Sequence, residues 1–545
     1  MHKQEKTPDM GRTRILLAIL SLFSFCVWAH MPDTPKVKHL ARTAGDGDSE
    51  KKVYLEYAET LDFDEKQSAD YQILRGNVRF RKEGMYMFCD SAYFYEQSNS
   101  LDAFGNVRME QGDTLFVYSD VMFYDGMTQI ARLRYNVKME NQDMVLFTDS
   151  LNYDLVPNIG YFFEGGKLID SENELTSIYG QYSPDTKRAV FNYDVQLVNP
   201  DYTLYSDTLE YSTLTKVADI LGPSVIVSDS NVIYSRRGWY DTQNNLSTLY
   251  DRSIIVSKSQ HLTGDTIFYD REKGFGEVFG NMFLDDTLRM VIMEGQYGFY
   301  NEKTEFAFAT DRARALEYSR GDTLYLHADT LKGFTLPDST RQLQAYYGTR
   351  FFRNDIQGVC DSMNYFTRDS ALYMYKDPIV WSDSYQIFGD TIKVFMNDST
   401  VDWVHIPQFA FAAQQKDSLF FDQLSGKDLK AYFMDGELYK VDVSGNVQTI
   451  FYPQERDSTF TGLNQAESSF LTMYLKDQQM DKLIMWPEVQ GSLTPVPLIR
   501  RGQLFLPDYQ WFEAYRPKDP DDIFRTVEKP ESDEPKKKKR RFGTQ

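Results

Sequence analysis

An aspartate recurs along the chain in a short motif, usually followed by serine or threonine, and it is the first candidate for chemistry. Clear copies of the motif contain Asp90, Asp120, Asp149, Asp207, Asp265, Asp329, Asp361 and Asp390. A row of carboxylates could bind Ca²⁺, because this cation prefers oxygen ligands. The same residue types also close turns and strand ends by hydrogen bonding to nearby groups. Calcium-binding repeats use glycine-rich nonapeptides, which this sequence lacks, so we expect hydrogen bonding and no metal.

The other residue types that often do chemistry form no recognisable site. The six histidines are His2, His30, His39, His261, His327 and His405. None has the spacing of a metal-binding pair, and the sequence has no nucleophile elbow, phosphate-binding loop or dinucleotide fingerprint. Cys89 and Cys360 stand at the same place in distant copies of the motif, so we expect small strand residues and no disulfide. We therefore predict a protein that is not an enzyme and has no cofactor.

The aspartate motif belongs to a longer repeat. Over much of the chain, successive copies differ in residue number by 29, 30 or 58, and a second marker, Gly-Asn-Val or a close variant, has the same interval. The second marker is clearest at Asn77, Asn106, Asn136, Asn281 and Asn446. Residues 262–284 hold one complete unit, with a strand signal, a charged turn and the start of a second strand. Two markers with one period predict a repeat protein.

Apolar and polar side chains alternate within each unit, which predicts strands with one apolar face. About 29 residues are enough for two long strands and two turns. We expect each unit to add one strand spacing, about 4.8 Å, to each wall of an elongated array of antiparallel strands. The apolar face is represented by fourteen residues: Val78, Phe80, Val107, Met109, Val137, Met139, Leu151, Tyr153, Leu209, Tyr211, Ile267, Tyr269, Met282 and Leu284.

Composition narrows the classes of partner. The chain has 545 residues, a formal charge of −21 and 15% aromatic residues, and its mean hydropathy is −0.50. Many aromatics in a polar chain suit a long, thin sheet better than a thick globular core. Binding of nucleic acid needs a basic surface, so the acidic balance argues against a nucleic-acid partner.

The start of the chain, residues 1–29, predicts a signal peptide. Basic residues precede an apolar run from Ile15 to Trp28, and the small residues Val27 and Ala29 suit cleavage after Ala29. Lipid attachment at Cys26 and a retained anchor are the alternatives. Residues 30–52 are polar and predict a flexible lead-in.

Three further segments follow the lead-in. Residues 53–485 predict the repeat array, and residues 486–525 are rich in proline and aromatics and predict a cap on the last sheet. Residues 526–545 end in a basic run and predict a disordered tail. This tail could contact anionic lipid or another envelope component, or it could be a solvated end.

The repeat resembles the OstA/LptA family of lipopolysaccharide-transport proteins. The resemblance rests on Asp-Ser/Thr-Leu-x-Tyr, a charged turn and Gly-Asn-Val, and the best copies run from Asp90 to Met109 and from Asp265 to Leu284. It implies an all-β, half-open β-jellyroll in the periplasm, whose interior shields the acyl chains of lipopolysaccharide on the way to the outer membrane. It also implies that other lipopolysaccharide-transport proteins join through exposed edge strands.

This chain departs from the family pattern in its length and in its proline-rich, basic C-terminal part. It looks most like the long OstA-like proteins of Bacteroidetes-type bacteria. The resemblance therefore implies a periplasmic protein that binds lipopolysaccharide or a related lipid, with a possible attachment to the outer membrane.

Periodicity leaves two interpretations of the apolar face. The fourteen residues could line an open lipid-binding groove, in which case the protein serves outer-membrane biogenesis. They could equally fill a closed core, in which case the protein is a structural or adhesive β-solenoid without lipid. A carbohydrate-active β-helix would need a local carboxylate cluster that breaks the repeat, and the sequence shows none.

Overall fold

The computed structural model describes most of the predicted array and cap. The described residues are 52–63, 70–229, 231–319, 321–338, 340–397, 400–455, 459–476 and 479–527. The predicted signal peptide with Cys26, residues 30–51 of the lead-in and residues 528–545 of the tail lie outside them. The chain divides into two units, Met1–Lys52 and Val53–Gln545, and the fold below is that of the second unit.

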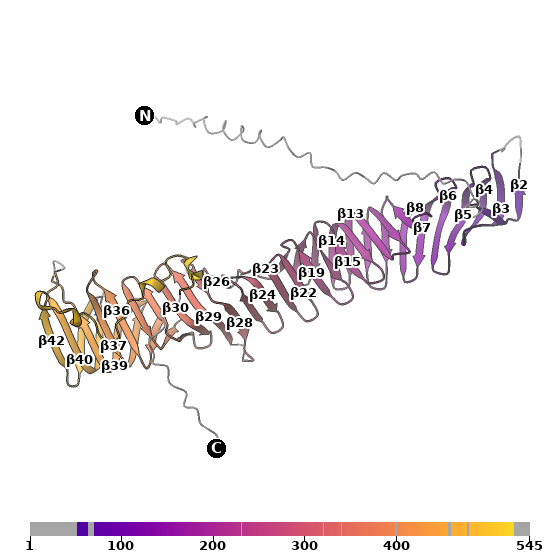
Figure 1. Ribbon diagram of the computed structural model, residues 1–545. Helices are drawn as coiled ribbons and strands as arrows, with labels where there is room; N and C mark the ends of the chain where they lie inside the picture. Colours follow the sequence, from indigo (N-terminus) through magenta and orange to yellow (C-terminus); the bar gives the residue numbers. More distant parts are fainter. Residues whose placement is uncertain are drawn as a thin grey trace, which may run out of the picture. The chain divides into compact units, whose positions relative to one another are not determined.

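The fold is all-β and antiparallel, as predicted. The described residues form 42 strands, no α-helix and four short 3-10 turns, and the strands follow one another in sequence order from indigo to yellow (Figure 1). No helix that could span a membrane occurs in the described part of the chain.

The strands build two walls, here called wall A and wall B. Fourteen long strands contribute one half to each wall: β3 (Gln72–Lys82), β4 (Met85–Tyr95), β5 (Ser100–Gln111), β6 (Leu115–Asp125), β7 (Ile130–Asn141), β8 (Met144–Asp154), β13 (Arg188–Asn199), β14 (Tyr202–Ser212), β23 (Phe275–Asp286), β24 (Val291–Asn301), β29 (Arg341–Arg353), β30 (Ile356–Phe366), β39 (Glu437–Phe451) and β40 (Gly462–Lys476).

Shorter strands belong to one wall each. Wall A contains β2 (Thr60–Asp62), β9 (Ile159–Phe162), β12 (Tyr179–Ser183), β15 (Val217–Ile220), β18 (Gly238–Asp241), β19 (Leu246–Tyr250), β22 (Thr266–Asp270), β25 (Phe306–Thr310), β28 (Thr330–Thr335), β31 (Ala371–Tyr375), β34 (Thr391–Met396), β35 (Val401–Ile406), β38 (Asp428–Met434) and β41 (Gln479–Trp486). Wall B contains β1 (Tyr54–Tyr57), β10 (Gly166–Ile169), β11 (Glu174–Ser177), β16 (Ser224–Ser228), β17 (Asn231–Ser235), β20 (Ile254–Ser257), β21 (Gln260–Thr263), β26 (Arg314–Glu317), β27 (Leu324–His327), β32 (Ile379–Ser382), β33 (Tyr385–Gly389), β36 (Ala410–Gln415), β37 (Phe421–Gly426) and β42 (Gln490–Pro495).

The Gly-Asn marker is where a long strand passes from one wall to the other. Gly105 and Asn106 have φ angles of +74° and +44°, a left-handed conformation that glycine and asparagine tolerate best. The pairing of β5 with β6 shifts register between Phe104 and Val107, as it does around several other Gly-Asn steps. Such a bulge bends the strand, so the repeated marker sets the repeated bend.

One repeat adds more length than the sequence suggested. Asn77 lies on β3 and Asn106 on β5, and the complete strand β4 separates them. A 29-residue unit therefore adds two strands to each wall, about 9.6 Å. The expectation of one strand per wall and unit was wrong because each long strand crosses both walls and is counted in both.

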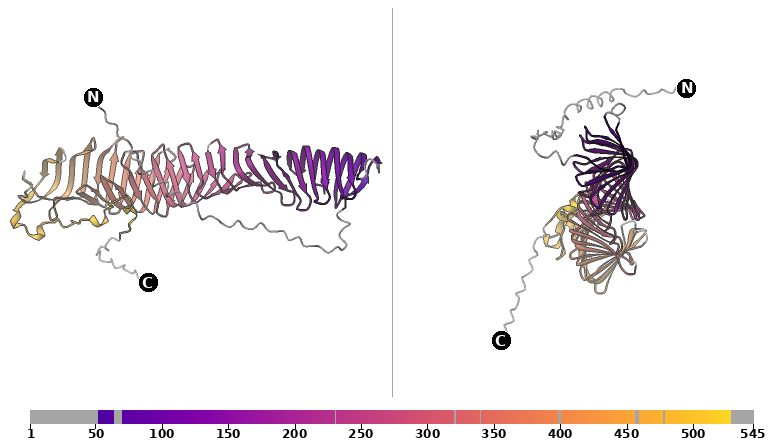
Figure 2. Two further views of the ribbon diagram at one scale, coloured as in Figure 1. Left: turned by 90° about the horizontal axis from the view of Figure 1, so that it is seen from above. Right: turned by 90° about the vertical axis from the view of Figure 1, so that its right-hand side faces the viewer.

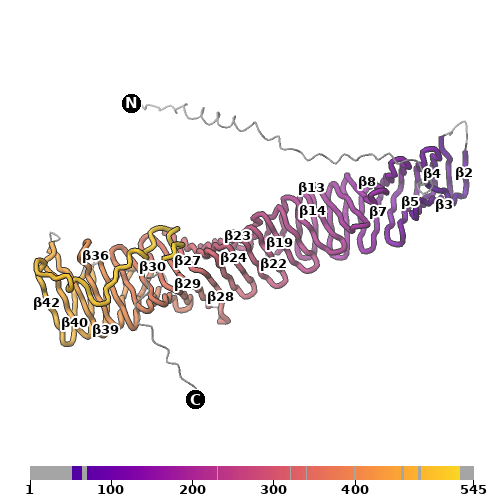
Figure 3. Tube along the Cα trace, in the orientation of Figure 1, coloured from indigo at the N-terminus to yellow at the C-terminus, as the bar shows by residue number. Residues whose placement is uncertain are grey.

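A continuous apolar core fills the space between the walls, and the last described segment lies outside it. The predicted boundary between array and cap falls at the end of β41, and β42 beyond it still pairs with β40. Residues 496–527, here called the strap, then run back past β36 and β30 towards β27 (Figure 3). The view from above shows the strap in yellow alongside the C-terminal strands (Figure 2). The strap contains the 3-10 turns η1 (Val496–Leu498), η2 (Arg501–Gln503), η3 (Glu513–Tyr515) and η4 (Asp522–Phe524).

Buried glutamines of wall B hold the strap. Gln423 Nε2 donates to Leu504 O at 2.8 Å, and its Oε1 accepts from Leu506 N at 2.9 Å. Gln386 makes the same pair of bonds, to Gln510 O at 2.8 Å and from Phe512 N at 2.7 Å. The strap covers the outer face of wall B, where it buries Trp381 and Phe411 in two clusters separate from the main core.

Candidate functional site

The interior between the walls is the candidate site, and the fourteen predicted residues all lie in it. Each has at most 9% of its surface exposed, and nearly all belong to one continuous apolar cluster. Their shared face is therefore the inner face of the walls. Lipid contact at these residues remains a prediction, because the interior at this level is filled by side chains from both walls.

A regular row of tyrosines runs along the inner face of wall A. The tyrosines lie near the strand ends that are furthest from the Gly-Asn bend. Tyr153, Tyr182, Tyr211, Tyr240 and Tyr269 follow one another at the interval of the repeat. Cross-strand pairing places a small residue between each pair of tyrosines, in this order: Gly160, Ala189, Ala218 and Ser247. The space at Gly160 is narrow, since a Cβ there would lie 2.8 Å from the methyl carbon of Met139. Large and small side chains thus interdigitate along the edge.

Each of these tyrosines contacts a residue of wall B. Tyr153 Oη donates to Gln111 Oε1 at 3.3 Å, Asn141 Nδ2 donates to Tyr182 Oη at 3.1 Å, and Asn231 Nδ2 donates to Tyr269 Oη at 3.0 Å. Tyr211 bonds Asp170, and the ring of Tyr240 lies 4.6 Å from that of Tyr202. These contacts join the two walls at the strand ends that are furthest from the bend. We call this row and its partners the tyrosine seam.

Asp170 is the charged centre of the tyrosine seam. Its side chain is fully buried, and Oδ2 accepts from Tyr211 Oη at 2.5 Å and from Lys216 Nζ at 3.0 Å. Burial alone would raise the pKa of Asp170, but bonds from Tyr211, Lys216 and the backbone N–H groups of Glu172 and Asn173 outweigh it and lower the pKa. Asp170 is therefore a carboxylate at neutral pH, and it ties wall B to two residues of wall A.

The seam does not continue through the C-terminal half. After Tyr269 the row contains Gly276 and the half-buried Tyr300, and then Ala307 pairs directly with Gly333. The alternation of large and small residues ends there. We call β3–β23 the sealed section and β24–β41 the unsealed section.

Some apolar inner residues of the unsealed section are only half-buried, although others, such as Ile392 and Ile406, are fully buried. The half-buried residues packed against the main core include Met293, Leu326, Val380, Ile387 and Leu424 of wall B and Leu372, Val394, Val404, Phe433 and Met473 of wall A. The residues at the same position of wall A in the sealed section, such as Tyr153 and Tyr211, are fully buried. Part of the apolar inner surface of the unsealed section is thus accessible to solvent.

A comparison with models of known protein families gives a match in the N-terminal half of the chain. A family model described as OstA-like protein matches residues 50–207 and 201–265. Residues 50–265 belong to the OstA-like family. No curated protein matches the chain. The OstA-like region contains the sealed section up to the start of β22, so the unsealed section lies beyond the matched residues.

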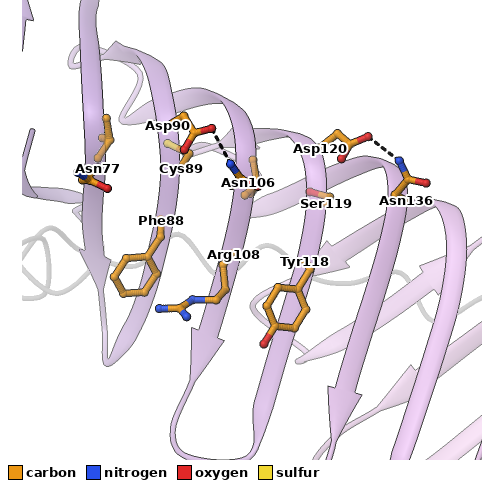
Figure 4. Close-up of a pocket in the computed structure, with 12 residues that line it drawn as sticks. Asn77, Phe88, Cys89, Asp90, Asn106, Arg108, Tyr118, Ser119, Asp120 and Asn136 are labelled. Atoms are coloured by element: carbon orange, nitrogen blue, oxygen red, sulfur yellow. Dashed lines mark hydrogen bonds between the residues drawn. The ribbon is translucent and has the colours of Figure 1, made fainter.

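The bends of the OstA-like region carry a small polar pocket of about 480 Å³. Asn106 Nδ2 donates to Asp90 Oδ2 at 2.8 Å, and Asn136 Nδ2 donates to Asp120 Oδ2 at 2.7 Å (Figure 4). These bonds confirm the hydrogen-bonding interpretation of the aspartate motif. No group of three or more potential metal ligands occurs among the described residues. Burial raises the pKa of the Cys89 thiol in this pocket to about 12, so it is not a nucleophile at neutral pH.

Sequence reasoning found one part of the site and missed three others. It placed Tyr153, Tyr211 and Tyr269 on the inner face, but it omitted Tyr182 and Tyr240, which share the repeat interval and could have been found from it. It also chose no inner residue after Leu284, because the repeat markers weaken there. The partners of the tyrosines lie more than one repeat unit away in sequence, and no local pattern points to them.

Proposed function

We propose that this protein is an exported lipid-binding protein that shields the acyl chains of lipopolysaccharide during transport to, or assembly of, the outer membrane. Membership of the OstA-like family supports a role in lipid transport. The observation that carries the proposal is the half-buried, apolar inner surface of the unsealed section. The proposal assigns the protein no catalytic activity, and it places the protein in the periplasm.

The energetics favour the unsealed section as the place for acyl chains. Each methylene group transferred from water to an apolar surface contributes about 0.8 kcal/mol, so a chain of 12 carbons would gain roughly 10 kcal/mol. In the sealed section the same chain would first have to separate bonds such as those of Tyr211 and Asp170. Leaving buried polar groups without partners costs about 1–3 kcal/mol each. Lipid contact at the fourteen predicted residues therefore requires the seam to part.

The two ends of the array suit partners that add strands. The first strands, β1 and β2, carry the exposed side chains Tyr57 and Leu61. At the other end, β41 and β42 carry the exposed side chains Trp486 and Leu493. Edge strands with apolar side chains favour pairing with another chain, and we propose other lipopolysaccharide-transport proteins as these partners.

We propose a second, structural role for the sealed section alone. Its filled interior is what the β-solenoid alternative predicts, and it would act as a rigid arm that carries the unsealed section. This role is compatible with lipid binding further along the same chain.

Photo-crosslinking in living cells tests the proposal. A photoreactive residue replaces Val394 in the unsealed interior, Leu209 in the sealed interior, or Arg108 on the outer face. We expect adducts with lipopolysaccharide at Val394 and none at Leu209 or Arg108. Adducts at Leu209 as strong as those at Val394 would show that the seam opens and would overturn the placement. No adduct at Val394 or Leu209 would overturn lipid transport and leave the structural role.

A further inference from the structure

The outer face of wall A in the unsealed section carries a stack of aromatic rings. Phe395 and Trp403 lie with centroids 4.1 Å apart and planes at 5°, and the ring of Tyr432 follows at 6.5 Å and 18° from Trp403. Tyr373 meets Phe395 on the other side at 6.1 Å. Four neighbouring strands thus present one continuous aromatic ridge.

Strand register fixes the face on which this ridge stands. Phe395 is opposite Trp403, and Trp403 is opposite Tyr432. The alternate residues Val394 and Val404 pack on the main core. The rings therefore point away from the interior, and the strap contacts described above lie on the other wall.

Lysines stand among the rings. Lys393 Nζ lies 5.2 Å from the centroid of Tyr373, and Lys440 Nζ lies 5.1 Å from that of Tyr432. Two carboxylates share the face, and each is paired: Asp442 with Lys440 at 2.6 Å and Asp428 with His405 at 2.6 Å. With histidine counted as neutral, Lys393, Lys430 and Lys440 exceed the two carboxylates by one charge, although the whole chain carries a formal charge of −21.

The geometry of the rings decides between possible ligands. Phe395, Trp403 and Tyr432 stack on one another, whereas Tyr373 meets Phe395 at 69°. Lys393 and Lys440 lie over the rings of Tyr373 and Tyr432, so ring faces are covered by other rings or by lysines. A sugar ring that stacks on an open aromatic face finds no such face here. Aromatic rings interspersed with lysines are instead the composition found at the interface of a lipid bilayer, where lysines attract anionic headgroups.

We propose that this aromatic–lysine face, formed by Tyr373, Lys393, Phe395, Trp403, Tyr432 and Lys440, docks on the surface of an anionic lipid bilayer. The aromatic rings enter the headgroup region, and Lys393 contacts the phosphates. This contact is separate from acyl-chain binding in the interior, and it does not depend on that function.

Vesicle co-sedimentation of the full chain tests the proposal. The vesicles contain phosphatidylethanolamine alone or with one third phosphatidylglycerol. We expect binding to the anionic vesicles, and we expect that binding to weaken as salt is raised. Lys393→Glu should lower the bound fraction about tenfold, and Trp403→Ala should lower it severalfold.

Trp239→Ala is the matched control, since Trp239 stands on the outer face of wall A in the sealed section. It should leave vesicle binding unchanged. Lys393→Gln is a second surface variant that tests the charge if Trp403→Ala disturbs the fold. Equal binding to both vesicle types, or equal loss with Trp239→Ala, would overturn the proposal. Self-association that Trp403→Ala abolishes without vesicles would instead assign this face to a second copy. Crosslinking of Val394 to lipid in detergent reports on the interior alone, so the two proposals can fail independently.

Discussion

Gly105 is one residue whose replacement reports on the bend between the walls. Its φ of +74° is unfavourable for any residue with a Cβ, and a Cβ there would lie 2.6 Å from Asp90 Oδ2. The carboxylate that it would strike is the one that Asn106 holds. The glycine and asparagine of the marker therefore have separate tasks, one in conformation and one in hydrogen bonding.

We expect Gly105→Ala to weaken the β4–β5 region by about 2 kcal/mol, from left-handed strain and the steric contact together. Hydrogen exchange of peptides from these strands measures the change. Gly84→Ala is the control, because Gly84 has a similar φ of +83° but no atom near its missing Cβ. It should cost only about 1 kcal/mol. Equal effects of the two variants would show that the contact with Asp90 does not matter.

Tyr211→Phe tests the tyrosine seam at a single atom. The variant keeps the buried ring but removes the hydroxyl that donates to Asp170, so a buried carboxylate loses a partner. We expect local destabilisation of about 1–3 kcal/mol, seen as faster amide exchange in β10, β11 and β14. Tyr205→Phe, on a tyrosine that is 48% exposed on the outer face, should have no measurable effect. A silent Tyr211→Phe would argue against the seam.

Asp170 makes the seam sensitive to acid. Its pKa is lowered in the folded state, so its contribution is complete above the ordinary aspartate value of about 3.9 and is lost as pH falls through the lower folded value. We expect Asp170→Asn to be less stable than the natural protein at pH 7, with the difference shrinking below about pH 4. Thermal melting at several pH values measures this. A difference that does not change with pH would contradict the assignment.

Local patterns predicted single residues well where the signal was local. The Gly-Asn marker was identified as turn chemistry, and the inner face of Tyr153 and Tyr211 followed from alternation. The partner of Tyr211 was not predictable in this way, because Asp170 lies 41 residues earlier and meets it only across two walls.

At the scale of elements, the strap is held by side chains that form the hydrogen bonds a neighbouring strand would form. Gln386 is fully buried and offers both its amide N–H and its carbonyl to the strap backbone. The indole of Trp381 also donates to its Oε1 at 3.1 Å. Gln386 thereby gives the strap backbone one donor and one acceptor, as the backbone of a paired strand would.

We expect Gln386→Ala to release the middle of the strap, because the backbone groups of Gln510 and Phe512 lose their partners in a buried place. The cost should be about 2–3 kcal/mol locally. Limited proteolysis, followed by identification of cuts between residues 504 and 516, measures it. Gln344→Ala changes a half-buried glutamine on the outer face of wall A and should leave the cutting pattern unchanged. If both variants are cut alike, the glutamine contacts do not hold the strap.

The strap was only partly predictable. Its prolines and aromatics indicated a covering segment, since proline lacks a ladder donor. The sequence did not say that it covers the outer face of wall B and not the interior. That choice depends on the outward apolar residues of β32 and β36, and in a strand an outward apolar residue looks the same as an inward one until register is known.

At the scale of the whole molecule, the two sections should differ in stability. A repeat array is stabilised mainly by contacts between neighbours, so its parts can open separately. We expect slower amide exchange in β13–β23, where the seam joins the walls, than in β24–β35. Hydrogen exchange with mass spectrometry measures both sections in one experiment. Added lipopolysaccharide should slow exchange in the unsealed section only, and uniform protection would contradict the division.

The period of the repeat was predicted from the sequence, but the division into sections was not. Two markers with a common interval were enough to predict the repeat and the all-β fold. Whether the interior is sealed depends on a contrast between Tyr269, which has a partner in wall B, and the later pair of Ala307 with Gly333. This contrast can be recognised only when strand pairing is known, because pairing brings residues from distant units into one row.

The regular interval of the tyrosines has a consequence for how such a protein can change length. A duplication of one unit would preserve the contacts of the tyrosines and would lengthen the arm by about 9.6 Å. An insertion inside one of these strands shifts its register and moves Gly160 or Ala189 away from the tyrosines. Unequal recombination of whole units avoids such a shift. Duplication lengthens the sealed section in fixed increments while the unsealed section stays unchanged.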